Sequence, residues 1–282
     1  MDLILGHNQF LGISHISDER GREREKKFSD VKNIYNIVEK AVDLGYKGMI
    51  LETHPRMLEF IEYYKKNKTF EIEFYLQLPY THGYIQKINE KGFNGLILQI
   101  FKQGGLKTVS TSILKDIVNF IKKDYISIGI SFLQFEIEPF KDINIKAVLL
   151  HNIITDLCLS LRMSNALQEF SSFVEEKMEI KSGFITLNFE LFKTTFEENN
   201  KHPLVMTPIN PGGYDMNPSK TAVEAAIRKY RGEIIAMNIL GGGAFSVDKA
   251  HDYLLSLDRL KYCVVGASSE EHLQELIEVF RG

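Results

Sequence analysis

The sequence predicts an α/β fold, a (β/α)8 TIM barrel, with residues 1–282 forming a single domain. Short apolar runs alternate with helical patterns along the whole chain, which is typical of a parallel sheet covered by helices. No linker, low-complexity tract or change of composition divides the chain. No glycine-rich dinucleotide fingerprint follows the first apolar run, and this favours a closed barrel over an open doubly wound sheet.

Ten apolar runs, most of them ending at a polar residue, are candidate strands. Continuous apolar runs of this length are expected where a strand is buried on both faces. A barrel of this class has eight strands, so two of the ten must belong to an accessory hairpin, to edge strands or to a misread helix. We expect the error between residues 95 and 150, where the candidates are crowded. The ten runs are residues 3–5, 48–51, 74–76, 95–98, 126–130, 147–150, 184–187, 204–206, 234–237 and 262–265.

Helical patterns fill most of the gaps between these runs. Apolar side chains recur there at intervals of three and four residues, which places them on one face of a helix. The predicted helices cover residues 31–44, 57–64, 113–121, 166–174, 222–230 and 273–280.

The composition is that of an ordinary globular protein, with 44% hydrophobic and 25% charged residues. A formal net charge of −3 provides no general attraction for nucleic acid or for anionic lipid. The basic residues of the segment 20–27 alternate with acidic ones, as on a solvated surface or in a mobile loop. We therefore expect neither nucleic acid nor a membrane as a partner.

The expected location is the cytoplasm. Cys158 and Cys263 lie far apart in the sequence and form no CxxC pair, as in proteins of a reducing compartment. Residues 1–10 lack the charged start and long apolar stretch of a secretion signal. No apolar run approaches the roughly 18 residues that a membrane span requires.

Polar residues follow the predicted strands, at the rim where barrels bind their ligands. This ring is rich in neutral hydrogen-bonding groups and poor in charge, which suits a small hydroxylated or carbonyl-bearing substrate. Its members are His7, Asn8, Gln9, Glu52, His54, Gln77, Tyr80, Gln99, Ser131, His151, Asn152, Thr186, Asn188, Thr207, Asn210, Asn238, Ser268 and Ser269.

Glu52, His54 and His151 are the candidate catalytic residues. Glu52 and His54 follow one predicted strand and His151 follows another, so the three can converge on one cavity where burial shifts their pKa values. Glu52 or His151 would then act as the general acid or base, oriented by its neighbours. The structural alternative is a glutamate paired with a nearby Arg or Lys and histidines hydrogen-bonded within the rim.

We expect no metal site. Imidazole and carboxylate ligands from separate strand ends are typical of catalytic zinc or manganese sites. However, the first strand offers a single imidazole, His7, in place of an HxH pair, and the other strand ends lack further acids.

Two glycine-rich loops near the end of the chain are candidate phosphate sites. Barrels often bind phosphate at the loops after their seventh and eighth strands, where backbone N–H groups and a helix N-terminus face the anion. The alternative is that the glycines form a tight turn and that Ser268 caps the last helix. The candidate cofactor-binding residues are Gly241, Gly242, Gly243, Gly266, Ala267, Ser268 and Ser269.

The loop at residues 208–214 contains two prolines and two glycines. Such a rigid segment either shapes a wall of the pocket or only redirects the chain.

The C-terminal part of the chain resembles the aldo-keto reductases. Residues 234–243 (IIAMNILGGG) and 263–273 (CVVGASSEEHL) are similar to the family's seventh and eighth strands with their loops. Leu149-Leu150-His151 resembles its fourth strand, which ends in the substrate-pocket histidine, and residues 183–189 (GFITLNF) resemble its fifth. The resemblance covers about the last 135 residues.

This resemblance implies a (β/α)8 barrel that binds NADP(H), with the adenosine phosphates near Gly266 to Ser269. It implies that His151 matches the catalytic histidine and that Glu52 takes the place of the catalytic aspartate. The sequence departs from the family at the catalytic Tyr, which does not follow Glu52, and at the third-strand Lys, which is replaced by Gln77 or Ser131. Leu276 stands where the family has an adenine-contacting Asn. Without the Tyr and Lys, a reductase loses most of its means of protonating the new alkoxide.

Three hypotheses follow from the sequence. The first is an aldo-keto-reductase-like barrel that binds a phosphate-bearing ligand or nucleotide, with altered or lost reductase activity. The second is a non-redox lyase, isomerase or hydrolase that acts on a small hydroxylated substrate through Glu52, His54 and His151. The third is a noncatalytic binding protein on the same scaffold.

Overall fold

The computed structural model describes residues 1–13, 18–80 and 125–281. Eight parallel strands close into a barrel in sequence order, from β1 to β8, with β1 paired to β8. The predicted fold class is therefore confirmed. The strands are β1 (Asp2–Leu5), β2 (Gly48–Leu51), β3 (Glu73–Leu78), β4 (Ile145–Leu150), β5 (Lys181–Ile185), β6 (Leu204–Pro208), β7 (Ile234–Met237) and β8 (Tyr262–Val265).

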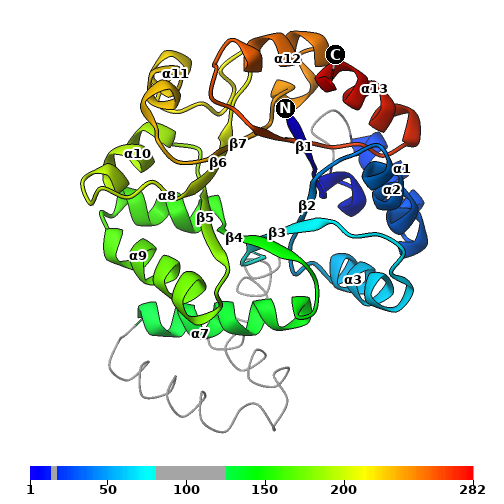
Figure 1. Ribbon diagram of the computed structural model, residues 1–282, viewed down its shortest axis with the longest axis horizontal. Coiled ribbons are helices and arrows are strands. Elements are labelled where there is room, and N and C mark those ends of the chain that lie inside the picture. The colour runs from blue at the N-terminus through cyan, green and yellow to red at the C-terminus, as the bar shows by residue number, and fades with distance from the viewer. Residues whose placement is uncertain (14–17, 81–124, 282) are drawn as a thin grey trace, which may run out of the picture.

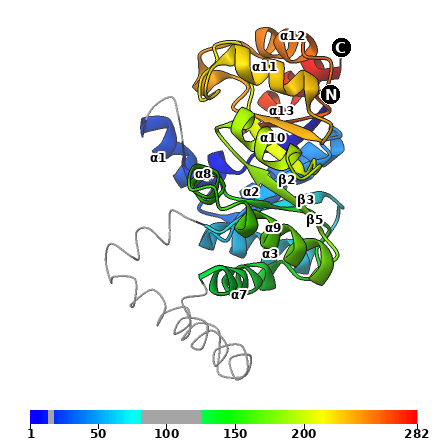
Figure 2. The same ribbon diagram turned by 90° about the vertical axis from the view of Figure 1, so that its left-hand side faces the viewer.

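Helices surround the strands in sequence order, from α2 and α3 through α7 to α12 and α13 (Figure 1). The two termini lie on one side of the molecule and α1 lies on the other (Figure 2). The helices are α1 (Asp18–Lys27), α2 (Val31–Asp43), α3 (Pro55–Asn67), α7 (Tyr125–Ile137), α8 (Asn152–Ser160), α9 (Ser164–Ser172), α10 (Phe189–Glu197), α11 (Lys220–Lys229), α12 (Val247–Leu255) and α13 (Glu270–Arg281). Short 3-10 segments are η1 (Asn8–Leu11), η2 (Glu138–Phe140) and η4 (Gly241–Gly243), and Phe173–Lys177 forms a π-helix.

Side chains of each strand alternate between the lumen of the barrel and the layer beneath the helices. Ile4 of β1 belongs to the lumen cluster, while Leu3 and Leu5 pack in the larger cluster beneath the helices. Both faces are apolar, which explains the continuous apolar runs in the sequence. The lumen cluster consists of Ile4, Ile50, Tyr75, Ala147, Leu149, Ile185, Leu204, Met206 and Ile235.

Two glycines make room for large side chains inside the barrel. A Cβ atom at Gly48 would lie 2.7 Å from the Tyr75 ring, and one at Gly183 would lie 2.6 Å from Leu149 Cδ2. Interiors are packed at the density of organic crystals, so these positions accept no side chain without a shift of the neighbour. Tyr75 and Leu149 thus fill the lumen below the rim.

One strand prediction was wrong, and another lies outside the described residues. Residues 126–130 belong to helix α7, so Ser131 lies within a helix rather than at a strand end. The apolar run continues for the length of a helix, and periodicity alone does not separate a buried helix from a buried strand. The candidate strand 95–98, Gln99 and the candidate helix 113–121 fall in the range 81–124, which the structure does not describe.

The charged segment 20–27 lies in helix α1. This helix packs on η1, since a Cβ atom at Gly12 would lie 2.9 Å from Glu25 Cβ. Phe28, directly after α1, is fully buried and packs edge-on against Phe10 at 4.9 Å between ring centroids. Among the helices of residues 1–13, 18–80 and 125–281, none has the length and apolar character needed to cross a bilayer.

Candidate active site

The alternation of the strands brings Glu52, Gln77 and His151 to the top of the lumen. Each residue lies two positions beyond a lumen residue, namely Ile50, Tyr75 and Leu149 respectively. Side chains two apart on a strand point to the same face. His54 and His151, when protonated, also lower the pKa of Glu52, so the three predicted catalytic residues lie at one rim of the barrel.

Glu52 is a buried and ionised carboxylate. Its side chain is 5% exposed, and Oε2 lies 3.5 Å from His7 Nε2. Burial alone raises the pKa of Glu52, but the hydrogen bond and charge of His7, with the charges that His54 and His151 carry when they are protonated at acidic pH, lower it to below its ordinary value. The carboxylate therefore carries its charge at neutral pH, where it is able to accept a proton.

His54 and His151 cap the helices that follow their strands. His54 is the N-cap of α3, and its Nδ1 atom accepts a hydrogen bond from Arg56 N at 3.1 Å. His151 is the N-cap of α8, and its Nδ1 atom accepts one from Ile153 N at 3.2 Å. A ring nitrogen that accepts an N–H carries no proton, so each imidazole is neutral and carries its hydrogen on Nε2.

The surroundings of His54 keep it neutral. Burial lowers its pKa, the charge of Glu52 acts in the opposite direction, and the charges of Arg56 and His7 lower it further. The positive end of the α3 dipole also disfavours an imidazolium at this position. His54 is therefore a hydrogen-bond donor through Nε2 rather than a cation.

Tyr80 joins this group, although sequence analysis placed it only in the polar ring. Its ring meets the His54 ring edge-on, with 5.3 Å between centroids. Burial and the charge of Glu52 raise the pKa of Tyr80, so the phenol keeps its proton at neutral pH. His7 was likewise placed only in the ring, and its contact with Glu52 depends on a pairing of β1 with β2 that is not local in sequence.

The glycine turn after β7 uses its own backbone donors. Gly241 N donates to Asn238 O at 2.9 Å, Gly242 N to Asn238 Oδ1 at 3.0 Å, and Gly243 N to Leu240 O at 3.0 Å. All three glycines have positive φ, of 56°, 71° and 92°. The glycines thus serve a tight turn, and their N–H groups are already hydrogen-bonded.

The loop after β8 is covered by side chains of the same protein. A Cβ atom at Gly266 would lie 2.8 Å from Gln9 Oε1. Lys27 Nζ, at the end of α1, donates to Ser268 O at 2.7 Å. Ala267 is buried, with 1% of its surface exposed. These contacts occupy one side of the predicted phosphate loop.

The N-terminus of α13 is capped within the chain. Ser269, rather than Ser268, is the cap, because Ser269 Oγ accepts from His272 N at 3.3 Å. The Glu271 carboxyl is hydrogen-bonded to the Glu271 backbone N–H and to the Ser269 hydroxyl, and both bonds hold its pKa below its ordinary value. A carboxylate of the protein therefore lies where an anion would bind.

These loops do not fit the phosphates of NADP(H) in this arrangement. The donors of residues 241–243 are hydrogen-bonded within the turn, and Glu271 places a negative charge at the helix N-terminus. Leu276 is fully buried in the core, so it offers no polar contact to an adenine ring. The predicted binding role of residues 241–243 and 266–269 stays a prediction.

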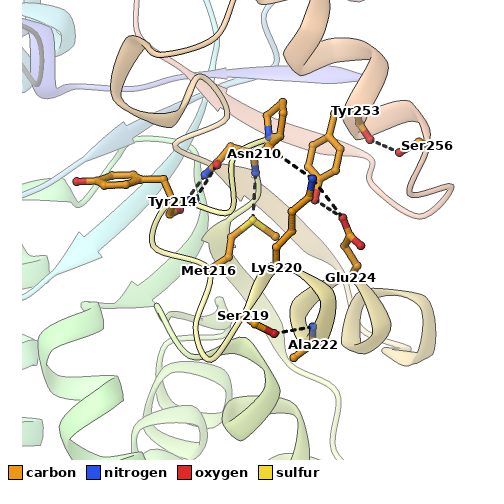
Figure 3. Close-up of polar contacts among 10 residues, drawn as sticks. Asn210, Tyr214, Met216, Ser219, Lys220, Ala222, Glu224, Tyr253 and Ser256 are labelled. Atoms are coloured by element: carbon orange, nitrogen blue, oxygen red, sulfur yellow. Dashed lines mark hydrogen bonds and ion pairs between the residues drawn. The ribbon is translucent and has the colours of Figure 1, made fainter.

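The loop after β6 is held in place by Asn210, which is fully buried. Asn210 Nδ2 donates to Tyr214 O at 2.8 Å, and Asn210 Oδ1 accepts from Tyr214 N at 2.9 Å (Figure 3). Lys220 Nζ donates to Pro211 O at 2.7 Å and lies 4.6 Å from the centre of the Tyr253 ring (Figure 3). The loop is therefore a rigid part of the rim.

A cavity of about 560 Å³ lies near the beginnings of β4 and β5, at the other end of these strands from His151. Phe140, Asn144, Phe173 and Ile180 are among its lining residues, and none of the predicted site residues lines it. Within the part of the chain that the structure describes, no three or more His, Cys, Asp or Glu side chains are grouped so as to hold a metal ion.

Known structures share this architecture. Two structures of a Pseudomonas aeruginosa protein assigned to the aldo-keto reductases each match with a TM-score of 0.58 at 12% identity, covering 99% of this chain and 89% of theirs. An aldo-keto reductase from a Medee basin deep-sea metagenome library matches with a TM-score of 0.52 at 12% identity, covering 90% of this chain and 82% of its own. No protein-family model matches the sequence, and no curated protein does.

The fold is that of the aldo-keto reductases. The likeness extends over the whole chain, whereas the sequence resemblance was confined to its last part. In this barrel the third strand, β3, contains Gln77, and Ser131 lies in α7. At 12% identity the likeness concerns the fold alone.

Proposed function

We propose that this protein is a non-redox enzyme, an isomerase or lyase, that moves a proton on a small hydroxylated carbonyl compound. One observation supports this proposal above the others: the imidazoles of His54 and His151, each with Nδ1 fixed by a backbone N–H, lie close enough to Glu52 to lower its pKa when they are protonated. A carboxylate base beside neutral imidazole donors suits proton abstraction next to a carbonyl group.

In this reaction Glu52 removes a proton from the carbon next to the substrate carbonyl. The electron pair of the broken C–H bond forms a C=C bond, and the carbonyl oxygen becomes an enediolate oxygen. The Nε2–H groups of His54 and His151 donate to that oxygen as its negative charge develops. Return of the proton from Glu52 to the former carbonyl carbon, with the proton of the neighbouring hydroxyl passing to the enediolate oxygen, completes an isomerisation. In an elimination the enediolate electrons instead re-form the carbonyl and a C=C bond to the β-carbon, and the β-hydroxyl group leaves as water with the proton that Glu52 removed.

Two further residues have roles in this scheme. His7, 3.5 Å from Glu52, orients the carboxylate and helps to keep it ionised. Tyr80 keeps its proton because burial raises its pKa, so its hydroxyl is available as a donor to the substrate or to a leaving hydroxyl group.

A catalytic role accounts for the site better than a purely binding role does. A buried charge is costly unless it is paired and hydrogen-bonded, and the neighbouring His54, whose pKa is lowered by burial, provides no compensating charge at neutral pH. Reductase chemistry on NADP(H), with a phosphate-bearing ligand at residues 241–243 and 266–269, is the alternative that the sequence resemblance implies. The self-capped loops weigh against it. We retain a cytoplasmic location, since both cysteines are free thiols.

Solvent exchange separates these possibilities. The protein is incubated in D₂O with a panel of aldoses, ketoses and hydroxy acids, with and without NADPH, and deuterium at carbon is followed by NMR. We expect deuterium next to a carbonyl group of at least one compound without any cofactor. NADPH consumption with no such exchange would contradict the proposal in favour of a reductase, and neither exchange nor consumption would favour a binding protein.

A further inference from the structure

A second buried glutamate lies beside the candidate active site. Glu136 belongs to α7, which begins 73 residues after Glu52 in the sequence, and only 3% of its surface is exposed. Its Oε2 atom accepts a hydrogen bond from the Thr53 hydroxyl and another from Tyr80 N, the latter at 3.3 Å. One oxygen atom thus links the loop after β2 to the loop after β3.

The two linked residues adjoin the groups that the proposed chemistry needs. Thr53 lies between Glu52 and His54 in the chain, and Tyr80 carries the phenol that packs against His54. The two loops follow the paired strands β2 and β3, and Thr53 and Tyr80 each lie two residues beyond the end of a strand. Beyond the strands a common acceptor holds the loops together, because both donors bind the same oxygen atom.

Helix α7, which carries this acceptor, is packed into the core of the protein. Leu133 and Ile137, three residues before and one residue after Glu136, are buried in the main core cluster, and Phe140 follows in η2. Lys65 Nζ of α3 donates to Pro139 O at 3.0 Å, which ties the end of α7 to the helix that His54 caps. Glu136 is therefore attached to the rigid part of the molecule.

We propose that Glu136 is a positioning residue that fixes the contact between His54 and Tyr80 at the rim. The inference rests on the proposed function, since the contact matters for catalysis only if both groups act as donors. It nevertheless has a readout that needs no substrate. The Tyr80 ring lies edge-on to His54 at 5.3 Å, so it shifts the NMR signals of the His54 ring protons.

The experiment compares the ¹H–¹³C signals of His54 in the full chain and in variants at one pH. Tyr80→Leu removes the aromatic ring, so its spectrum gives the positions of the His54 signals when the contact is completely lost. We expect Glu136→Ala to move the His54 signals most of the way to their Tyr80→Leu positions. Glu136→Gln keeps an oxygen acceptor for both donors, so its His54 signals should stay near those of the unmodified protein.

Two controls distinguish a loss of positioning at His54 from a general loosening of the protein structure. His151 caps a different helix, so its ring signals should stay in place in Glu136→Ala. Glu138→Ala removes an exposed carboxylate of the same region that pairs with Lys141, and it should move neither histidine. If Glu136→Ala does not fold, Thr53→Val breaks one of the two links and should give a partial shift of His54.

An unchanged His54 spectrum in Glu136→Ala would overturn the inference, as would equal shifts of His54 and His151. The outcome is independent of the proposed reaction, because the spectra are recorded without substrate. A His54 shift together with no deuterium exchange in any compound would support the positioning role and reject the proton-transfer function.

Discussion

Two parts of the barrel rim differ in what they do with their hydrogen-bond donors. Over β2 to β4, backbone N–H groups of α3 and α8 donate to histidine Nδ1 atoms, and this puts the hydrogen of each ring on Nε2 at the rim that carries Glu52. Over β7 and β8, the glycine turn and the α13 cap direct their donors to acceptors within the same loops. A glycine-rich loop therefore indicates an anion site only if its N–H groups are not already hydrogen-bonded within the protein.

The largest effect expected from this comparison concerns Glu52. Glu52→Gln keeps the shape of the side chain and removes the base, so we expect deuterium exchange to fall by about 10²–10⁴-fold, the usual contribution of a general base. The rate is measured by NMR on the substrate found in the panel. Gly242→Ala, in the other part of the rim, serves as the control and should leave the rate unchanged. Equal rates for Glu52→Gln and the unmodified protein would contradict the assignment of the base.

The next effect concerns His151 as donor and cap. His151→Asn retains a side-chain oxygen for Ile153 N but removes the Nε2–H group, so we expect the rate to fall by about 10²–10³-fold, as for loss of one oxyanion donor. Its melting temperature should stay near that of the unmodified protein. His151→Ala also loses the cap and should cost about 1 kcal/mol of stability in addition. A His151→Asn variant with full activity would reject the donor role.

In the Gly241–Gly243 turn we expect a substitution to change the free energy of unfolding and to leave the reaction rate unchanged. Gly242 has φ of 71°, so Gly242→Ala places a side chain in the left-handed region at a cost of about 1–2 kcal/mol. Gly129→Ala in α7, where a Cβ meets no neighbour within 4 Å, should instead stabilise by about 0.5–1 kcal/mol. Denaturant unfolding measures both. If NADPH raises the melting temperature and Gly242→Ala abolishes that rise, the turn binds the cofactor and our interpretation fails.

The smallest expected effect is the pH dependence of stability. The pKa of Glu52 is lower in the folded protein than its ordinary value, because His7 and its neighbours outweigh burial. This stabilisation is present above the unfolded pKa of about 4.3 and is lost as the pH falls through the folded pKa. Glu52→Gln should therefore lose less stability than the unmodified protein on acidification below about pH 4.3. A steeper loss in the variant would contradict the sign of the shift.

Much of the fold could be predicted because it depends on local patterns. All eight strands gave apolar runs, since they are buried on both faces, and the strand ends located Glu52 and His151 at one rim. Residues 126–130 were misread because an apolar run inside a helix of 13 residues resembles a buried strand.

The contacts that define the site could not be predicted in the same way. Thr53 and Glu136 are 83 residues apart, and the pattern around Glu136 indicates nothing about the loop it holds. The Gly241–Gly243 turn was recognisable from its glycines, but the acceptor at each N–H depends on the three-dimensional path of the loop. The local sequence shows which hydrogen-bonding groups are present, whereas the tertiary fold determines which of them are already hydrogen-bonded within the protein.

The proposed chemistry depends on the tautomers of His54 and His151, which can be measured. Long-range ¹H–¹⁵N spectra of the imidazoles at neutral pH distinguish the two neutral tautomers and the imidazolium. We expect both rings to be neutral, with the proton on Nε2 and Nδ1 unprotonated. A proton on Nδ1 of either ring, or an imidazolium at either position, would mean that the helix caps do not leave a donor facing Glu52, and the proposed chemistry would then have no basis.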